Sequence, residues 1–255
     1  MLENLKITDV LFLDIETVSG KAEYSELDET FQYLWKHKCK SILRQYDEEI
    51  DDKLAAKTYK DKAGIFAEFG KIVCISVGFM HWNKEISKYE LKLKSFADDD
   101  EVKLLSDFAS LVTQYYSNIN KHFLCGHNLR EFDIPYIGRR MAINMMEIPK
   151  MMDLAGKKPW ETKQLLDTLE LWKFGDFKNY TSLKLLTALF GIPSPKDDID
   201  GSEVGRVYWE EKDLERIAIY CEKDVLAVVQ LVLKYKRQNL LEEDQISSVS
   251  GFGEG

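Results

Sequence analysis

The chain has 255 residues, of which 45% are hydrophobic and 12% aromatic, and it carries a net charge of −9, as expected for a globular protein. No apolar run approaches the ~20 residues of a membrane-spanning helix, and the start, MLENLKITDV, lacks the layout of a signal peptide. Cys39, Cys74, Cys125 and Cys221 are scattered without C-x-x-C spacing. We therefore expect reduced, buried thiols in a cytoplasmic protein rather than disulfides or a zinc site.

The first half of the chain predicts three strands with a helical insertion after the first of them. Apolar runs predict strands at 10–14 and 71–80, and alternation predicts a half-exposed strand at 89–93. Residues 22–63 are rich in charge and have helical spacing, which predicts an inserted helical excursion on the surface. An amphipathic helix with an acidic start is expected at 100–116.

The second half alternates predicted strands and helices without a polar linker. We expect strands at 122–126 and 165–172, a helix ending near 146, a capped helix at 181–190, and a last helix at 210–236. Residues 241–255 lack periodicity and are expected to be disordered. This pattern predicts one α/β domain over residues 1–240, with a mixed sheet flanked by helices.

The charge is unevenly distributed along the chain. Residues 121–186 contain eleven basic and eight acidic residues, a net charge of +3, so the remainder carries −12. The negative total argues against a protein that coats a nucleic-acid duplex. An enzyme that holds a strand end through bound metal ions needs fewer lysines, and a solvated face explains the basic excess equally well.

Asp14 and Glu16 lie two residues apart in the first predicted strand, within LFLDIET. Both side chains project from the same face of an extended segment, opposite the apolar Leu13 and Ile15. Two such carboxylates repel each other unless a cation lies between them or one pKa rises. Hard divalent ions such as Mg²⁺ or Mn²⁺ prefer oxygen ligands, although a strand that reaches solvent is the simpler interpretation of a lone D-x-E.

The second acidic motif, HNLREFD at residues 127–133, follows the strand at 122–126. Asn128 and Asp133 are expected around the junction of loop and helix, with Asp133 in the first helical turn. Taken alone, the pair is more typical of a helix cap, because Asp and Asn favour helix starts for local reasons. Phe132 is by itself more typical of a core residue than of a base-stacking group.

The third motif, IYCEKDV at residues 219–225, lies in the last predicted helix. Tyr220 and Asp224 are four residues apart and therefore neighbours on one helix face. Asp224 lies at the border of the apolar stripe, whereas Glu222 and other charged residues are expected on the solvent side. An acid turned toward the protein needs a partner, and a salt bridge or a hydrogen bond to Tyr220 would supply one.

The three motifs occur together and in a fixed order, and this combination is stronger evidence for a family than any one motif alone. On DIET, HNLREFD and YCEKD the chain resembles the DEDDy branch of the DnaQ-like 3′–5′ exonucleases. It is most similar to stand-alone relatives of the proofreading exonuclease domain of family B DNA polymerases. The resemblance extends to DTLELW, interpreted as a strand, and to GIPSPKDDIDGSEV, and it covers most of residues 8–236. It implies a ribonuclease H-like fold; the insertion at 22–63 is longer than expected.

The resemblance implies a metal-dependent exonuclease with two divalent ions, Mg²⁺ or Mn²⁺. The expected catalytic residues are four metal ligands and a tyrosine that orients the attacking water: Asp14, Glu16, Asp133, Asp224 and Tyr220. The expected contacts to the terminal nucleotide are Thr17, Asn128 and Phe132. The implied substrate is single-stranded nucleic acid with a free 3′ end, DNA in preference to RNA, and the product is a nucleoside 5′-monophosphate. His127 and Asp167 are candidates to support the site, although a structural role is the simpler interpretation of each.

Two other functions are compatible with parts of the sequence. A phosphatase of the haloacid dehalogenase type also carries its nucleophile on a strand, but its D-x-D motif is D-x-E here and its lysine motif is not evident. A non-catalytic nucleic-acid-binding module of the same fold would gain nothing from a repulsive cluster of carboxylates. Metal-dependent release of mononucleotides distinguishes the exonuclease from both.

Overall fold

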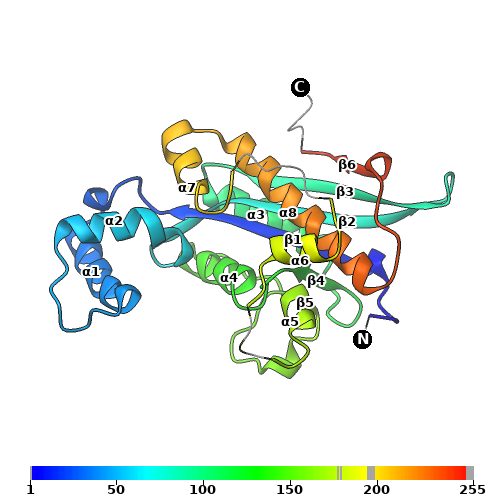
Figure 1. Ribbon diagram of the computed structural model, residues 1–255, viewed down its shortest axis with the longest axis horizontal. Coiled ribbons are helices and arrows are strands. Elements are labelled where there is room, and N and C mark those ends of the chain that lie inside the picture. Colours follow the sequence, from blue (N-terminus) through cyan, green and yellow to red (C-terminus); the bar gives the residue numbers. More distant parts are fainter. Residues whose placement is uncertain (1, 177, 179, 194–198, 251–255) are drawn as a thin grey trace.

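The computed structural model describes residues 2–176, 178, 180–193 and 199–250, and these form an α/β fold around a mixed sheet (Figure 1). Within them the sheet has six strands in the order β5-β4-β1-β2-β3-β6. The strands are β1 (Val10–Ser19), β2 (Gly70–Asn83), β3 (Lys88–Ala97), β4 (Phe123–Gly126), β5 (Leu165–Asp167) and β6 (Ile246–Ser248). β1, β2 and β3 form an antiparallel meander, whereas β4 and β5 continue the sheet in parallel. The predicted mixed α/β sheet is confirmed.

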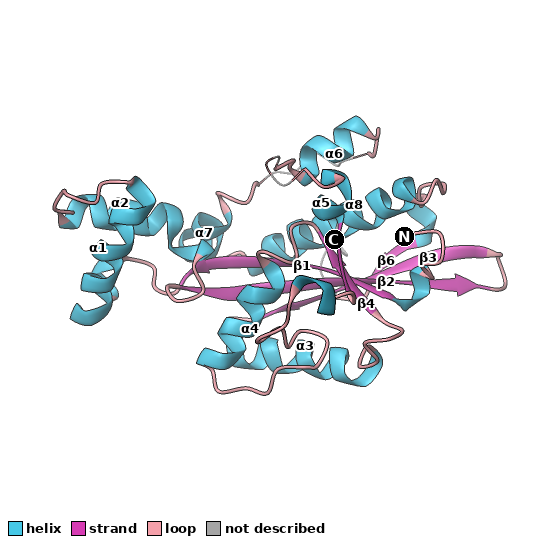
Figure 2. Cartoon of the chain, turned by 90° about the horizontal axis from the view of Figure 1, so that it is seen from below, coloured by secondary structure: helices cyan, strands magenta, loops and turns pink. Residues whose placement is uncertain are grey.

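Helices cover both faces of the sheet, with α3 and α4 on one side and α8 on the other (Figure 2). The helices are α1 (Glu29–Leu43), α2 (Asp52–Lys62), α3 (Glu101–Tyr115), α4 (Asp133–Ile143), α5 (Thr168–Lys173), α6 (Leu183–Leu189), α7 (Val204–Arg206) and α8 (Leu214–Tyr235). Among the described residues, no helix combines the length and apolar character needed to cross a membrane.

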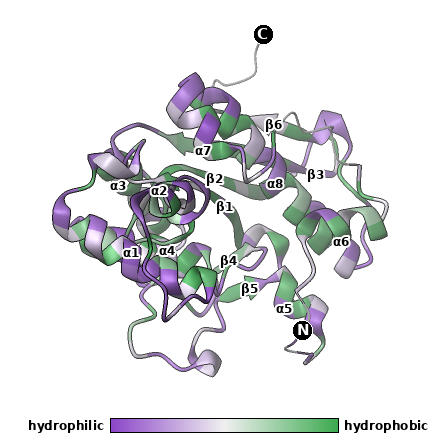
Figure 3. Ribbon diagram, turned by 60° about the vertical axis from the view of Figure 1, so that its left-hand side comes forward, coloured by the Kyte–Doolittle hydropathy of each residue, from purple (hydrophilic) through white to green (hydrophobic). Residues whose placement is uncertain are grey.

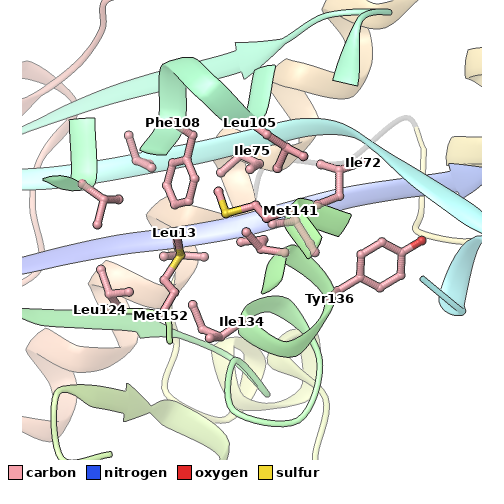
Figure 4. Close-up of a cluster of buried hydrophobic side chains, with 14 of the residues drawn as sticks. Leu13, Ile72, Ile75, Leu105, Phe108, Leu124, Ile134, Tyr136, Met141 and Met152 are labelled. Atoms are coloured by element: carbon pink, nitrogen blue, oxygen red, sulfur yellow. The ribbon is translucent and has the colours of Figure 1, made fainter. Parts of the chain in front are cut away.

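Alternation along β1 divides its side chains between two cores. Leu11 and Leu13 face α3 and α4, where they pack with Phe108 and other apolar residues (Figure 4). Phe12 faces α8 and packs with Val225. Burial on both faces explains the apolar run of this central strand, and Figure 3 shows the hydrophobic residues concentrated along β1 and β2. The next even-numbered positions of β1, Asp14 and Glu16, interrupt this pattern with acids.

The predicted helical insertion consists of α1 and α2, which pack on each other with a small core of their own. Trp35 is fully buried at its centre, and its indole Nε1 donates a hydrogen bond to the carbonyl of Ala55 at 2.9 Å. Both helices project from the end of the sheet where β1 finishes and β2 begins (Figures 1 and 2). All four cysteines are free and buried, as predicted.

The prediction of a strand over 165–172 is wrong beyond Asp167. β5 ends at Asp167, whose side chain accepts a hydrogen bond from the Leu169 N–H and so begins helix α5. The last helix begins at Leu214 rather than at 210, because a π-helical turn (Val207–Glu211) precedes it and Lys212 adopts a left-handed conformation with φ 59°. Part of GIPSPKDDIDGSEV, residues 194–198, lies outside the described residues.

The tail is not wholly irregular, and this corrects the predicted disorder of 241–255. Ile246–Ser248 forms β6 on the edge of β3. Its anchor is Glu222, which is buried rather than solvent-facing as predicted and accepts hydrogen bonds from the hydroxyls of Ser95, Ser248 and Ser250. The hydroxyls that satisfy this buried carboxylate come from β3, from β6 and from Ser250 just after β6, all far from Glu222 in sequence. Residues 251–255 lie outside the described residues.

Candidate active site

The first acidic motif lies where β1 extends past the end of β4. The parallel pairing of β1 with β4 ends at Phe12, opposite Cys125. Asp14 and Glu16 follow on the side covered by α8, and the pairing of β1 with β2 is irregular between Glu16 and Thr17. An irregularity of this kind bends a strand and redirects its side chains. Both acids are thus presented at the carboxyl end of β4, where loop and helix residues reach them.

Among the described residues, Asp14, Glu16 and Cys221 form a cluster of potential metal donors whose donor atoms all lie within 4.8 Å of one another. The Cys221 thiol contacts the carbonyl and the carboxylate of Asp14, at 3.4 and 3.7 Å. Burial raises the pKa of Cys221 well above its ordinary value, so the thiol keeps its proton. Cys221 therefore positions Asp14 as a hydrogen-bond donor, which leaves the carboxylates as the donors suited to a hard cation.

Asp133, at the first position of α4, is brought against the same part of β1. Its side chain is 3% exposed and accepts hydrogen bonds from its own backbone N–H and from that of Ile15, which lies between the two acids of β1. Burial raises the pKa of Asp133 to about 7. The second motif is therefore both a helix start and a component of the acidic cluster.

The electrostatics of Asp14 show that the acids of all three motifs lie close together. Burial raises the pKa of Asp14 well above its ordinary value, and the charges of Asp133, Asp224 and Glu16 raise it further. Burial and the charge of Asp224 likewise raise the pKa of Glu16. Carboxylates that disfavour one another's ionisation in this way are expected where a multivalent cation normally balances them.

Tyr220 and Asp224 share one face of α8 and are joined by a side-chain hydrogen bond. Burial, followed by the charges of Asp224 and Glu16, raises the pKa of the Tyr220 hydroxyl well above its ordinary value. The phenol therefore remains protonated at neutral pH and serves as a hydrogen-bond donor rather than as a base.

Asp167 holds the second motif in place, which answers the question that the sequence left open. Its buried carboxylate accepts hydrogen bonds from the backbone N–H groups of Asn128 at 2.9 Å and Arg130 at 3.0 Å, and from Leu169 at 2.9 Å. Asn128 adopts a left-handed conformation with φ 63°, which Asn tolerates. One side chain thus fixes the loop that leads into Asp133.

Replacing Asp167 by alanine is expected to destabilise the protein by roughly 2–4 kcal/mol, because three backbone donors lose their acceptor. Urea unfolding measures the loss. Asp167→Asn is the matched control, because its amide oxygen can still accept hydrogen bonds. Its free energy of unfolding should lie between those of the wild type and the alanine variant. Wild-type stability of the alanine variant would contradict this role.

His127 supports the neighbouring loop. Its Nε2 donates to the carbonyl of Thr181 at 2.9 Å, and its Nδ1 pairs with the Thr168 hydroxyl at 2.9 Å. The ring also lies 6.4 Å, between centroids, from that of Tyr180. Tyr180 is 67% exposed, and partial burial of its hydroxyl, followed by the charges of Asp133 and Asp167, raises its pKa. Tyr180 therefore stands at the rim of the acidic cluster, a position that no sequence motif indicated.

Comparison with known proteins identifies the family. Residues 65–250 match a family described as "Predicted 3'-5' exonuclease related to the exonuclease domain of PolB". The chain belongs to this family. The match leaves out residues 1–64, which contain Asp14, Glu16 and the helical insertion.

A solved structure similar to this family member is the family B DNA polymerase from the hyperthermophilic archaeon Pyrobaculum calidifontis, with a TM-score of 0.44 and 15% sequence identity. The similarity covers 89% of this chain and 24% of the polymerase, so the chain spans about a quarter of the polymerase's length. No curated protein matches the chain.

The three expected substrate contacts of this exonuclease-family chain differ in position. Thr17 and Phe132 line one cavity together with Glu16. Phe132 also packs on Tyr136, with ring centroids 5.4 Å apart. Asn128 does not line this cavity; its backbone N–H donates to Asp167, and its carbonyl accepts hydrogen bonds from the N–H groups of Glu131 and Phe132. Thr17 and Phe132 are therefore the two placed beside the acids.

Proposed function

We propose that this family member is a metal-dependent 3′–5′ exonuclease that removes nucleoside 5′-monophosphates from single-stranded nucleic acid. We further propose that DNA is preferred to RNA, that the enzyme is cytoplasmic, and that residues 1–240 act as one domain with residues 22–63 as an insertion. The observation that carries the proposal is the convergence of carboxylates from β1, α4 and α8 in one cluster.

The donor set fits hard divalent cations, because it consists of carboxylates, and burial together with the charges of neighbouring acids raises the pKa values of Asp14 and Glu16. Asp14, Glu16, Asp133 and Asp224 would hold two ions, Mg²⁺ or Mn²⁺, which when bound supply a hydroxide near neutral pH and balance charge at phosphorus. Residues of this chain would orient these ligands. Cys221 and the Ile15 N–H fix the orientation of Asp14 and Asp133, respectively.

Burial and the neighbouring acids keep the Tyr220 hydroxyl protonated, and its one proton is donated to Asp224 in this structure; with substrate bound, the hydroxyl would turn to donate it to the attacking oxygen and so orient that oxygen. Tyr220→Phe is expected to lower kcat by roughly 10- to 100-fold, since one positioned donor is lost while all four carboxylates remain. Measuring kcat against Mn²⁺ concentration separates loss of the oriented donor from loss of metal binding. If only the donor is lost, the Mn²⁺ concentration that gives half-maximal kcat should stay unchanged. A parallel loss of metal affinity would instead make Tyr220 part of the metal site.

Incubation with 5′-labelled single-stranded DNA and RNA oligonucleotides tests the proposal. With Mg²⁺ or Mn²⁺ we expect a ladder that shortens from the 3′ end, faster for DNA, and no shortening in EDTA. Shortening of neither strand with either metal would overturn the exonuclease. Retained binding would then identify a non-catalytic module of the same fold.

A further inference from the structure

A cavity of about 780 Å³ extends from Glu16, one of the proposed catalytic acids, to the helical insertion. On one side it is lined by Glu16, Thr17 and Phe132. Its other walls come from the end of the insertion at residues 60–62, from the turn that follows it at 64–65, and from residues 201–210. Figures 1 and 2 both show α2 and α7 side by side at this end of β1. A segment whose function the motifs left open thus reaches the site.

The insertion wall is held rigidly against β1. A Cβ on Gly64 would meet the backbone of Val18 at 3.1 Å, so the turn formed by Ala63–Ile65 lies directly on the strand. The Tyr136 hydroxyl donates to the Gly64 carbonyl at 2.8 Å. Lys60 pairs with Glu210 at 2.8 Å and links the insertion to the opposite wall. Packing and a hydrogen bond thus join this wall of the groove to the core beside Glu16, and an exposed ion pair joins it to the opposite wall.

Ile65 is the apolar feature of this wall. Its side chain is 53% exposed although its backbone is fixed on β1, and it lines the same cavity as Phe132. An exposed isoleucine on a rigid turn offers an apolar surface to a flat partner. Every nucleobase has such a face, which makes contacts of this kind tolerant of sequence.

The cations of the groove differ in availability. Arg206 pairs with Glu203 and Glu211, and Lys60 pairs with Glu210. Lys62 also lines the groove, is exposed, and forms no ion pair with any residue in the described part of the chain. Lys62 is therefore available for a phosphate without the loss of an existing ion pair.

We infer that the end of the insertion and the turn that follows it form one wall of the substrate groove, where Ile65 packs against a nucleobase and Lys62 pairs with a backbone phosphate. The occupant is a single strand of nucleic acid whose 3′ end lies at the acids, so this inference rests on the proposed function. Continuity of the groove with Glu16 selects this occupant, because a strand that ends at the acids must leave the site through a lined path.

Kinetics on single-stranded DNA of about 4–16 nucleotides test the inference. Ile65→Ala and Lys62→Gln are each expected to lower kcat/KM by roughly five- to twentyfold. Lys62→Gln should also reduce the slope of log affinity against log salt by about 0.7, the value for one phosphate contact on a single strand. The matched controls, Ile119→Ala and Lys57→Gln, change equally exposed residues outside the groove and should keep wild-type values.

Two failures can be told apart. If the wild-type protein degrades DNA and the two groove variants match their controls, the insertion is not a substrate wall and the proposed function stands. If the wild-type protein degrades nothing, the proposed function falls. Fluorescence anisotropy with a labelled oligonucleotide then tests separately whether the groove binds a single strand. Weaker binding by both variants than by their controls would support this role of the groove, and equal binding would overturn it.

Discussion

Asp14→Asn is expected to lower exonuclease activity by at least about a thousandfold, or about 4 kcal/mol of activation free energy. Asp14 is the acid that feels the charges of all three others, and so it occupies the centre of the cluster. An amide at this position keeps the shape of the side chain but removes the negative charge that would hold both cations. Time courses of oligonucleotide shortening at saturating Mg²⁺ or Mn²⁺ measure the loss.

The same substitution should stabilise the metal-free protein, and this separates chemistry from misfolding. Burial and three neighbouring acids make the ionised form of Asp14 unfavourable in the folded state. Its neutral replacement is therefore expected to raise Tm in EDTA above that of the wild type. Asp107→Asn, an exposed residue of α3, is the matched control for both measurements. Loss of activity accompanied by loss of stability would indicate damage to the fold instead.

The acids were predictable because strand and helix periods fix which side chains share a face. Asp14 and Glu16 follow from the two-residue period of β1, and Tyr220 and Asp224 from the four-residue spacing on α8. Neither rule places β1, α4 and α8 beside one another. That placement came from the resemblance, and the electrostatic coupling of the acids agrees with it.

What the sequence did not reveal depends on contacts between distant segments. Asp167 resembles any acid at a strand end, yet it accepts hydrogen bonds from the loop around Asn128. Glu222 has the helical position of a solvated residue, but serines of β3 and the tail surround it. The basic excess over 121–186 similarly includes Arg140, whose guanidinium pairs with the buried Glu101 at 2.6 Å. Composition does not distinguish such a structural cation from a phosphate contact.

The mistaken strand at 165–172 has a local cause. In TLELW the apolar residues alternate with polar ones as they would in a half-buried strand, and a short helix contains the same residues. The cap that Asp167 makes to the Leu169 N–H decides for the helix. Recognition of Asp167 as an N-cap would have shortened the strand and also drawn attention to its support of the site.

The metal-free protein is expected to lose stability as the pH rises through the range from about 4 to about 7. Burial raises the pKa of folded Asp133 to about 7 from an ordinary value of 3.8. The folded state therefore binds a proton that the unfolded state has already released, and the stability due to this proton disappears as the pH passes 7. The contribution is a few kcal/mol at most, or roughly 5–10 °C in Tm.

Asp133→Asn isolates this contribution from all other titrations. In EDTA, the wild type and the variant should have similar Tm values near pH 4, and the wild type should fall progressively below the variant up to about pH 7 and stay below it at pH 8. Divalent metal at pH 8 should restore the wild type, because a cation replaces the lost proton as the partner of the carboxylate. The variant should respond less to metal, since its neutral amide cannot replace a charged ligand. Equal pH dependence of the two proteins in EDTA would mean that Asp133 ionises freely, and the cluster would then have no need of a cation.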